Sequence, residues 1–248
     1  MKKKLSLIIS SVVLVIFVLL SFFVYNKTNN GIKQTIANNE IKLNTVFYKA
    51  SNKTGGALFV TDDKGENAYT ALANNLSKTG LDVITLKLNK SDSENNKKID
   101  LALQELKEKS NLENSDIILA GYDVGCFELL KYVSKSNEKF AGAVFLSPYF
   151  QQYDEKSVAI DNGSYVIDIP WVNNLNKDSF NFPVLILSTT TEDYSTPQLM
   201  TMLYNHLSSD DIQRSVGAFN ARNGNISLVI ETGVLHNFIQ TSDNIFQK

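Results

Sequence analysis

The stretch DIILAGYDVGCFELLKYVSKS, residues 116–136, decides the fold of this chain. An apolar run typical of a buried strand leads into Gly-Tyr-Asp-Val-Gly at positions 121–125, and an amphipathic helical pattern follows at once. A sharp strand-to-helix turn needs small residues two places before and after its apex, because the apex residue is strained and exposes its side chain. Gly121 and Gly125 meet that need. The pattern therefore predicts a nucleophile elbow with Asp123 at its apex.

Aspartate suits the apex of this turn, because it is among the few residues other than glycine that tolerate a positive φ. A Gly-x-Asp-x-Gly sequence, however, also marks ordinary tight turns. Two interpretations of Asp123 follow. It is either a reactive carboxylate at an elbow or a residue that only satisfies a turn.

The rest of the chain alternates short apolar segments with helical patterns, which is typical of a parallel sheet covered on both faces. Gly80 ends the first predicted helix, and Pro197 suits the first turn of the last one. Strands are predicted over residues 46–50, 57–61, 82–88, 117–120, 141–146, 184–188 and 226–230, and helices over 67–79, 100–109 and 197–207. The pattern predicts an α/β fold with a mostly parallel, doubly wound sheet.

An uncharged apolar stretch at residues 5–25 follows Met-Lys-Lys-Lys at positions 1–4. Roughly 20 such residues are needed for a helix to cross a bilayer. The stretch lacks the short apolar core and the A-x-A-like end of a signal peptide, which favours one uncleaved transmembrane helix over a cleaved leader. Three lysines precede it and Lys27 follows, so the positive-inside rule predicts a cytoplasmic amino terminus. We expect a single-pass protein of the cell membrane, bound to the lipid bilayer through residues 5–25, with its domain facing outward.

The chain after this segment divides into a linker and one domain. Residues 26–39 are polar and rich in Asn, Lys and Thr, which is typical of a stalk. Residues 40–248 suffice for one α/β domain with a full core, and the single Cys126 allows no internal disulfide. The net charge of −2, with both signs interspersed, argues against a nucleic-acid surface. We expect no cofactor and no resident metal.

Three residues able to form a catalytic triad follow predicted strands. In such sheets the functional groups gather at the carboxyl ends of the strands. Asp123, Asp193 and His236 each follow a strand, in the order nucleophile, acid, histidine. His236 is one of only two histidines in the chain, which makes its position informative. Glu192, beside Asp193, is an alternative for the acid.

With these pieces in order, the chain resembles the α/β-hydrolase superfamily over most of residues 45–246. Besides the elbow, the matching segments are FLSP at 145–148, PVLIL at 183–187 leading to Asp193, and LVI at 228–230 leading to His236. The resemblance implies a sheet of the α/β-hydrolase type. It also implies a hydrolase that acts on a small molecule.

The residue at position 123 decides which chemistry the resemblance implies. Members with serine there attack acyl carbons, whereas those with aspartate, such as haloalkane dehalogenases and epoxide hydrolases, attack an alkyl carbon and form an ester on the enzyme. In both groups the histidine, here His236, is a general base held in the right tautomer by the acid, here Asp193. With Asp123 as nucleophile, the base activates the water that hydrolyses the ester. The implied substrate is a small ester, epoxide or related molecule.

Two positions depart from the pattern of those families. Where they usually carry His-Gly and a nearby proline, this chain has TDDKG at residues 61–65, and an acidic loop there would repel an oxyanion. Dehalogenases typically have tryptophan after the nucleophile, but here Val124 follows Asp123. Lys64 and Tyr122 are the candidate donors to a leaving group.

Three other residues have structural interpretations. His206 lies late in a predicted helix, as a surface or helix-end histidine does. Cys126 follows the elbow and is more typical of a buried small hydrophobe than of a nucleophile. Trp171, the only tryptophan, falls in a possible short lid at residues 150–182 and is expected either to line a pocket or to anchor the lid.

Two other classes of function stay open. Loss of the serine and of the usual oxyanion loop is typical of a degenerate hydrolase fold that serves as a cell-surface binding or scaffold protein. The second class is a phosphotransfer site, in which four aspartates at one sheet edge would bind Mg²⁺: Asp62, Asp63, Asp123 and Asp193. The second alternative is less favoured, because Asp62-Asp63 lacks the Asp-x-Asp spacing of haloacid-dehalogenase-like phosphatases and His236 is left unused.

Overall fold

The structure is a computed structural model that describes residues 32–38, 41–62, 66–89, 92–149, 158–161, 164–167, 170–189, 196–210 and 219–231. The chain divides into two units, Met1–Ile32 and Lys33–Lys248, and only Ile32 of the first is described. The predicted transmembrane segment at residues 5–25 lies outside the described residues. Within the described ranges, no helix is long and apolar enough to cross a membrane.

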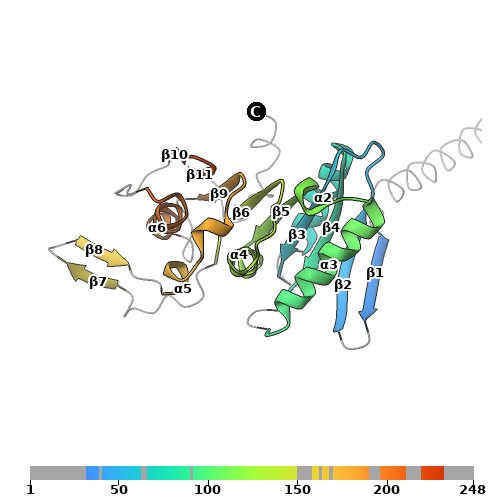
Figure 1. Ribbon diagram of the computed structural model, residues 1–248, viewed down its shortest axis with the longest axis horizontal. Coiled ribbons are helices and arrows are strands. Elements are labelled where there is room, and N and C mark those ends of the chain that lie inside the picture. The colour runs from blue at the N-terminus through green and yellow to red at the C-terminus, as the bar shows by residue number, and fades with distance from the viewer. Residues whose placement is uncertain are drawn as a thin grey trace, which may run out of the picture. The chain divides into compact units, whose positions relative to one another are not determined.

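A nine-stranded sheet organises the described residues, with the strand order β1-β2-β4-β3-β5-β6-β9-β11-β10 (Figure 1). Neighbouring strands from β4 through β11 run parallel, whereas β2 pairs antiparallel with β4 and β10 antiparallel with β11. The strands of this sheet are β1 (Ile32–Asn38), β2 (Ile41–Tyr48), β3 (Gly55–Thr61), β4 (Leu81–Lys87), β5 (Ile117–Tyr122), β6 (Gly142–Leu146), β9 (Val184–Thr189), β10 (Phe219–Asn223) and β11 (Ile226–Glu231). The predicted mostly parallel sheet is confirmed.

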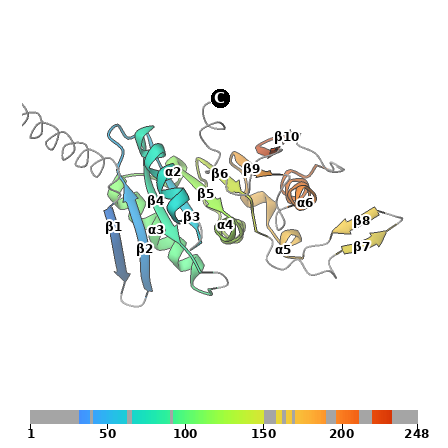
Figure 2. The same cartoon turned by 180° about the vertical axis from the view of Figure 1, so that it is seen from behind.

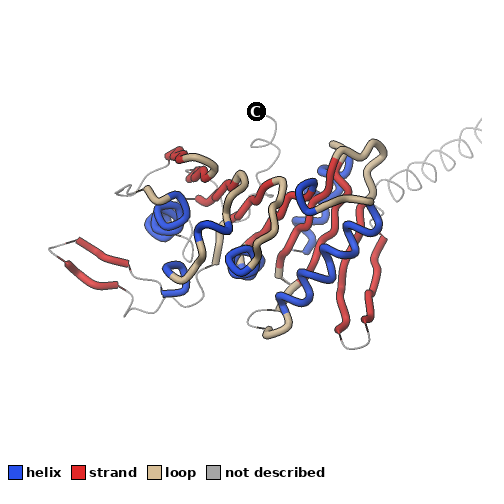
Figure 3. The backbone as a smooth tube through the Cα atoms, in the orientation of Figure 1, coloured by secondary structure: helices blue, strands red, loops and turns tan. Residues whose placement is uncertain are grey.

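Helices cover both faces of the sheet. Helices α3, α4 and α6 lie on one face and α2 lies on the other, as Figure 1 and the reverse view in Figure 2 show. The same layering is visible in Figure 3, where the blue helices flank the red strands. The helices are α2 (Glu66–Lys78), α3 (Asn95–Ser110), α4 (Val124–Lys135), α5 (Pro170–Asn173) and α6 (Pro197–Ser208), with 3₁₀ turns η1 (Asn114–Asp116) and η3 (Lys177–Ser179). The sheet is thus doubly wound, as predicted.

The core consists of one apolar cluster on each face of the sheet. Every residue of β3 is buried, and successive side chains of a strand point to opposite faces. Leu58 and Val60 therefore join the larger cluster, with α3, α4 and α6. Ala57 and Phe59 join the smaller cluster, with Tyr69 of α2. Burial on both faces explains why the central strands are apolar runs rather than alternating ones.

The direction in which the chain winds reverses between β3 and β5, which are neighbours in the sheet. From β3 the chain passes through α2 to β4, whereas from β5 it passes through α4 to β6 on the opposite side. In open α/β sheets, the crevice outside the carboxyl ends of the strands at such a reversal is the usual ligand site. The residue that follows β5 is Asp123.

Four of the described strands lie where the sequence predicts none. Strand β1 falls within residues 26–39, the predicted stalk, and β10 forms the opposite edge of the sheet. Within residues 150–182, the possible lid, β7 (Val158–Asp161) pairs antiparallel with β8 (Ser164–Ile167) as a separate two-stranded sheet. Strands β1 (IKQTIAN) and β10 (FNARN) have the mixed polar sequences typical of sheet edges, so their composition resembles that of a linker. Strands β7 and β8 have four residues each, too few for an alternating pattern to be recognised.

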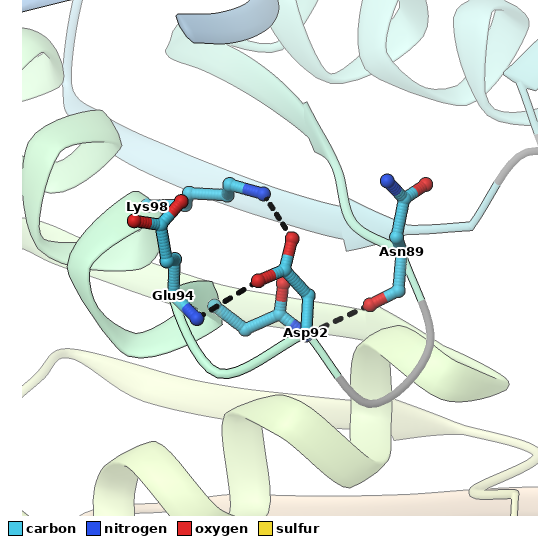
Figure 4. A network of polar contacts seen from close by, with 5 residues as sticks. Asn89, Asp92, Glu94 and Lys98 are labelled. Atoms are coloured by element: carbon cyan, nitrogen blue, oxygen red, sulfur yellow. Dashed lines mark hydrogen bonds and ion pairs between the residues drawn. The ribbon is translucent and has the colours of Figure 1, made fainter. Parts of the chain in front are cut away.

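A polar network holds the turn between β4 and α3 (Figure 4). The Asp92 carboxylate accepts a hydrogen bond from the Glu94 backbone N–H at 2.9 Å and lies 2.5 Å from Lys98 Nζ. The Asn95 side chain donates to the Asn89 carbonyl at 2.9 Å. Hydrogen bonding from Lys98 and Glu94 lowers the pKa of Asp92. Asp92 thus stabilises the turn that leads into α3, whose N-cap residue Glu94 makes no side-chain cap.

Candidate functional site

The turn from β5 into α4 has the strained geometry of a nucleophile elbow. Asp123 is the single residue between Tyr122, which ends β5, and Val124, which begins α4. Its backbone has φ 50° and ψ −117°, and it is one of four described non-glycine residues with a positive φ. The prediction that Asp123 tolerates a positive φ at this apex is confirmed. Strain of this kind persists only where the surrounding structure enforces it.

The two glycines of the motif are required by close backbone contacts. A Cβ at Gly125 would lie 2.1 Å from the carbonyl oxygen of Val60 in β3, and one at Gly121 would lie 2.9 Å from the backbone nitrogen of Cys126. Both distances are shorter than real Cβ contacts. Glycine at each position therefore lets α4 begin directly against the central strands.

Backbone hydrogen bonds fix Asp123 from three directions. Its N–H donates to the carbonyl of Leu146, the last residue of β6, at 3.2 Å. Its carbonyl accepts from Cys126 N–H at 3.1 Å, inside α4, and from Tyr149 N–H at 3.2 Å, beyond β6. Hydrogen bonds to β6, to α4 and to the segment after β6 thus hold Asp123 in its strained, positive-φ conformation.

The strand beside the elbow ends in a second strained residue. Ser147 follows β6, has φ 44°, is fully buried, and donates its N–H to the Leu187 carbonyl at 2.8 Å. The sequence predicts a strand end at FLSP, residues 145–148, but carries no signal of strain at Ser147. Serine has no strong preference for this conformation, so composition alone could not reveal it.

An aromatic cluster backs the elbow on the α2 side of the sheet. The ring of Tyr69 is stacked on Phe59 at 4.6 Å between centroids, and it meets Tyr122 at 4.8 Å with a tilt of 45°. Burial, reinforced by nearby Tyr122, Cys126 and Asp123, raises the pKa of Tyr69 far above its ordinary value. The sequence indicates Tyr122 as a candidate donor but not Tyr69, because no local pattern brings α2 against the end of β5.

Two members of the predicted triad lie beyond the described segments. Asp193 and Glu192 follow β9, and His236 follows β11. These two strands are neighbours and run parallel to β5, so their carboxyl ends lie at the same edge of the sheet as Asp123. The triad itself stays a prediction. Lys64 is also outside the described residues.

The three residues that the sequence assigns structural roles all lie within the described segments: His206, Cys126 and Trp171. His206, in the last turn of α6, contacts the Leu175 carbonyl through Nε2 at 2.9 Å. Cys126 is fully buried, its Sγ lies 3.2 Å from the Leu146 carbonyl, and burial raises the pKa of its thiol. Trp171 packs edge-to-face on Phe127 of α4 at 4.9 Å. Cys126 is thus the buried residue that was predicted, and Trp171 anchors α5 on the core.

The acidic residues give no support for a magnesium site within the described segments. Among those residues, no group of three His, Cys, Asp or Glu side chains lies close enough to hold a metal ion. Asp62, at the end of β3, is described and half-buried, whereas Asp63 and Asp193 are outside the described ranges.

Comparison with known proteins identifies the fold. No protein-family model and no curated protein matches the sequence. Est1E from Butyrivibrio proteoclasticus is similar in structure, with a TM-score of 0.59 and 16% identity over 86% of this chain and 94% of that one. The esterase Pf2001 from Pyrococcus furiosus has a TM-score of 0.62 and 13% identity over 90% of this chain and 91% of its own. An alpha-beta serine hydrolase homologue from Coxiella burnetii has a TM-score of 0.59 and 13% identity over 87% and 93%. The chain thus has the α/β-hydrolase fold.

Proposed function

From this shared fold we propose that the protein is a hydrolase in which Asp123 is the nucleophile, His236 the general base and Asp193 its acid partner. The observation that carries the proposal is the conformation of Asp123, strained to φ 50° at the apex between β5 and α4. The reversal of strand order lies directly beside it. A carboxylate that only satisfied a surface turn would not need two glycines pressed against β3 and α4 to hold it there.

The chemistry of the proposed site follows from aspartate at the apex. A carboxylate attacks without a base: its oxygen bonds to the alkyl carbon while the bond from that carbon to the leaving group breaks, which gives a covalent ester and releases the leaving group with its electron pair. An alkyl carbon that bears a leaving group, as in an epoxide, a haloalkane or a small ester, suits this attack. His236 then takes a proton from water, and the resulting hydroxide attacks the carboxyl carbon of the ester. The bond to the alkoxy group breaks, the alcohol leaves with the proton that His236 took from water, and the Asp123 carboxylic acid loses its proton to solvent, which restores the carboxylate.

We further propose that the enzyme acts at the outer face of the cell membrane. Residues 5–25 supply an apolar stretch of the length that a bilayer requires, preceded by three lysines. On this proposal the domain from Lys33 onward faces outward and meets its small-molecule substrate there. Fractionation of cells with protease added from outside tests the orientation, and a domain that stays protected in intact cells contradicts it.

The proposed nucleophile and base are tested with Asp123→Asn and His236→Ala in the full-length protein in detergent micelles. Panels of esters, epoxides and haloalkanes are the substrates. We expect turnover to fall by at least about 10³-fold in both variants, as it does when a nucleophile or base is removed. His206→Ala is the matched control, because the only other histidine lies on α6 against a backbone carbonyl.

A single-turnover reaction in H₂¹⁸O locates the nucleophile. Because water attacks the carboxyl carbon of the ester, one ¹⁸O atom should enter the Asp123 side chain, where mass spectrometry of the peptide detects it. Turnover that persists in Asp123→Asn, or turnover without ¹⁸O at position 123, contradicts the mechanism. Absence of turnover across all three substrate panels favours the alternative of a hydrolase fold retained for binding.

A further inference from the structure

The two edges of the nine-stranded sheet differ in how they are protected. Strand β1 forms one edge and β10 the other, and each has a single neighbour among the described strands (Figure 1). An edge strand offers N–H and C=O groups to another chain, so natural edges are kept short, charged or interrupted by proline. Strand β10 has only five residues and carries Arg222. Strand β1 has seven residues and no proline, and its one charged residue is Lys33, next to its start.

The sequence of β1 is complementary to itself in an antiparallel pair. When the pair is centred on Thr35, Lys33 of one copy is opposite Ala37 of the other, and Gln34 is opposite Ile36. The two Lys33 positions are then four residues out of register, about 14 Å apart along the strands, so like charges are not opposed. Thr35 is opposite Thr35 on the axis, and Thr–Thr is a favourable cross-strand pair. The pattern of β1 therefore fits a second copy of β1.

The place of β1 in the chain also favours a second copy as its partner. Residues 26–31 alone separate β1 from the proposed transmembrane segment at residues 5–25. Six residues reach at most about 22 Å, and the starts of two strands paired about Thr35 lie about 20 Å apart, so both linkers can enter one membrane. Anchoring in one plane raises the effective concentration of each copy for the other.

We propose that β1 is an interface at which two copies of the protein pair edge to edge in the membrane, antiparallel and centred on Thr35. A two-fold axis relates the copies, and main-chain hydrogen bonds join their two sheets into one. Seven paired residues make a small interface, so confinement to the membrane contributes to the pairing. In the sheet, β2, β4 and β3 separate β1 from β5, the strand that leads to Asp123, so pairing does not involve the proposed nucleophile.

Disulfide cross-linking of the full-length protein in its membrane tests the pairing. In Thr35→Cys the two cysteines are opposite each other, with Cα atoms about 4.5–5.5 Å apart, which is within the range that a disulfide needs. An oxidant should convert most of this variant to a dimer of twice the chain mass. Lys33→Cys is the matched control on the same strand, because its two cysteines are about 14 Å apart along the strands. The wild type gives the background, since its single cysteine, Cys126, is fully buried.

A charge placed on the two-fold axis should weaken the pair. Thr35→Lys sets two lysines directly opposite each other, which destabilises a cross-strand pair. Energy transfer between labelled copies of the full-length protein in liposomes measures the dimer fraction, and we expect the dissociation constant to rise by about fivefold. Asn220→Lys is the matched control, because it adds the same charge at an exposed position of β10, the other edge, and should leave transfer unchanged.

The outcomes decide for or against this interface. A cross-link in Thr35→Cys but not in Lys33→Cys, with transfer weakened by Thr35→Lys alone, supports the proposal. It is overturned by the absence of a Thr35→Cys dimer, by a cross-link to a protein of another mass, or by equal weakening in Asn220→Lys. A dimer formed by Lys33→Cys in place of Thr35→Cys overturns the centred register. Neither measurement needs a substrate, so the result is independent of the proposed hydrolase activity.

Discussion

Replacing Gly125 by alanine should destabilise the whole domain, because this glycine sets the distance between α4 and β3. The added Cβ would lie 2.1 Å from the carbonyl oxygen of Val60 and 2.5 Å from its carbonyl carbon. Ordinary contact begins at 3.4 Å, so the start of α4 must retreat from the strand by about 1.3 Å. Both atoms belong to the backbone of a buried central strand, so no side chain can rotate to make room.

The cost follows from the apolar layer that this displacement opens. Leu129, Leu130 and Val133 of α4 are at most 1% exposed and pack into the large core cluster. A gap of about 0.5–1 Å already forfeits about a quarter to a half of the dispersion attraction across it. Forced overpacking costs about 1–3 kcal/mol, occasionally more, and the helix propensity of alanine returns at most about 1 kcal/mol. At the upper end of that range, which a clash with buried backbone warrants, the net loss is about 2 kcal/mol, against a typical total of about 5–15 kcal/mol.

Urea unfolding of the full-length protein in detergent micelles measures this loss. Trp171 is the only tryptophan and packs on Phe127 of α4, so its fluorescence reports on the displaced layer. Gly224→Asn is the control, because that glycine has φ +55°, which asparagine tolerates, and nothing lies within 4 Å of an added Cβ. Gly121→Ala, with its closest contact at 2.9 Å, should fall between the two. A loss below about 1 kcal/mol in Gly125→Ala, or one no larger than the control's, refutes the reasoning.

Two further predictions concern single side chains. Hydrogen bonds from Lys98 and Glu94 lower the pKa of Asp92, so its contribution is present above the unfolded pKa of about 4 and lost as pH falls through the lower folded pKa. Asp92→Asn should thus cost about 1 kcal/mol or less at pH 6 and progressively less as the pH falls below 4, which thermal unfolding across that range measures; a loss that does not change with pH contradicts the charge argument. Cys126 is fully buried with a raised thiol pKa, so a disulfide reagent should label it only as fast as the protein unfolds; stoichiometric labelling of the native protein within minutes contradicts its placement.

The elements that the sequence predicts are those defined by local patterns. The strands over residues 57–61 and 184–188 and the helix over 197–207 match β3, β9 and α6 closely, because a strand buried on both faces is a continuous apolar run and Pro197 marks a helix start. The missed edge strands β1 and β10 have a polar composition that resembles a linker, and the missed hairpin strands β7 and β8 are only four residues long, too short to show a pattern.

Part of the candidate site is likewise predicted by local sequence, and part is not. Asp123 at a sharp turn between two glycines can be read from five consecutive residues, because the elbow is a local structure whose strain only small neighbours permit. The positions of Asp193 and His236 rest on their order after predicted strands, and their roles stay predictions. The strain of Ser147 has no sequence signal, since it arises where β6 meets the elbow and β9.

The sequence by itself determined the alternation of strands and helices, the glycine-flanked apex and the apolar segment at residues 5–25, because each depends on residues that are neighbours along the chain. Only the tertiary structure decided that Gly125 must clear the carbonyl of Val60 and that Tyr69 packs against Tyr122. Those contacts join residues more than 50 positions apart. They exist because parallel strands β3 and β5 are neighbours in the sheet while α2, α3 and β4 separate them in the chain, a pairing that no local pattern encodes.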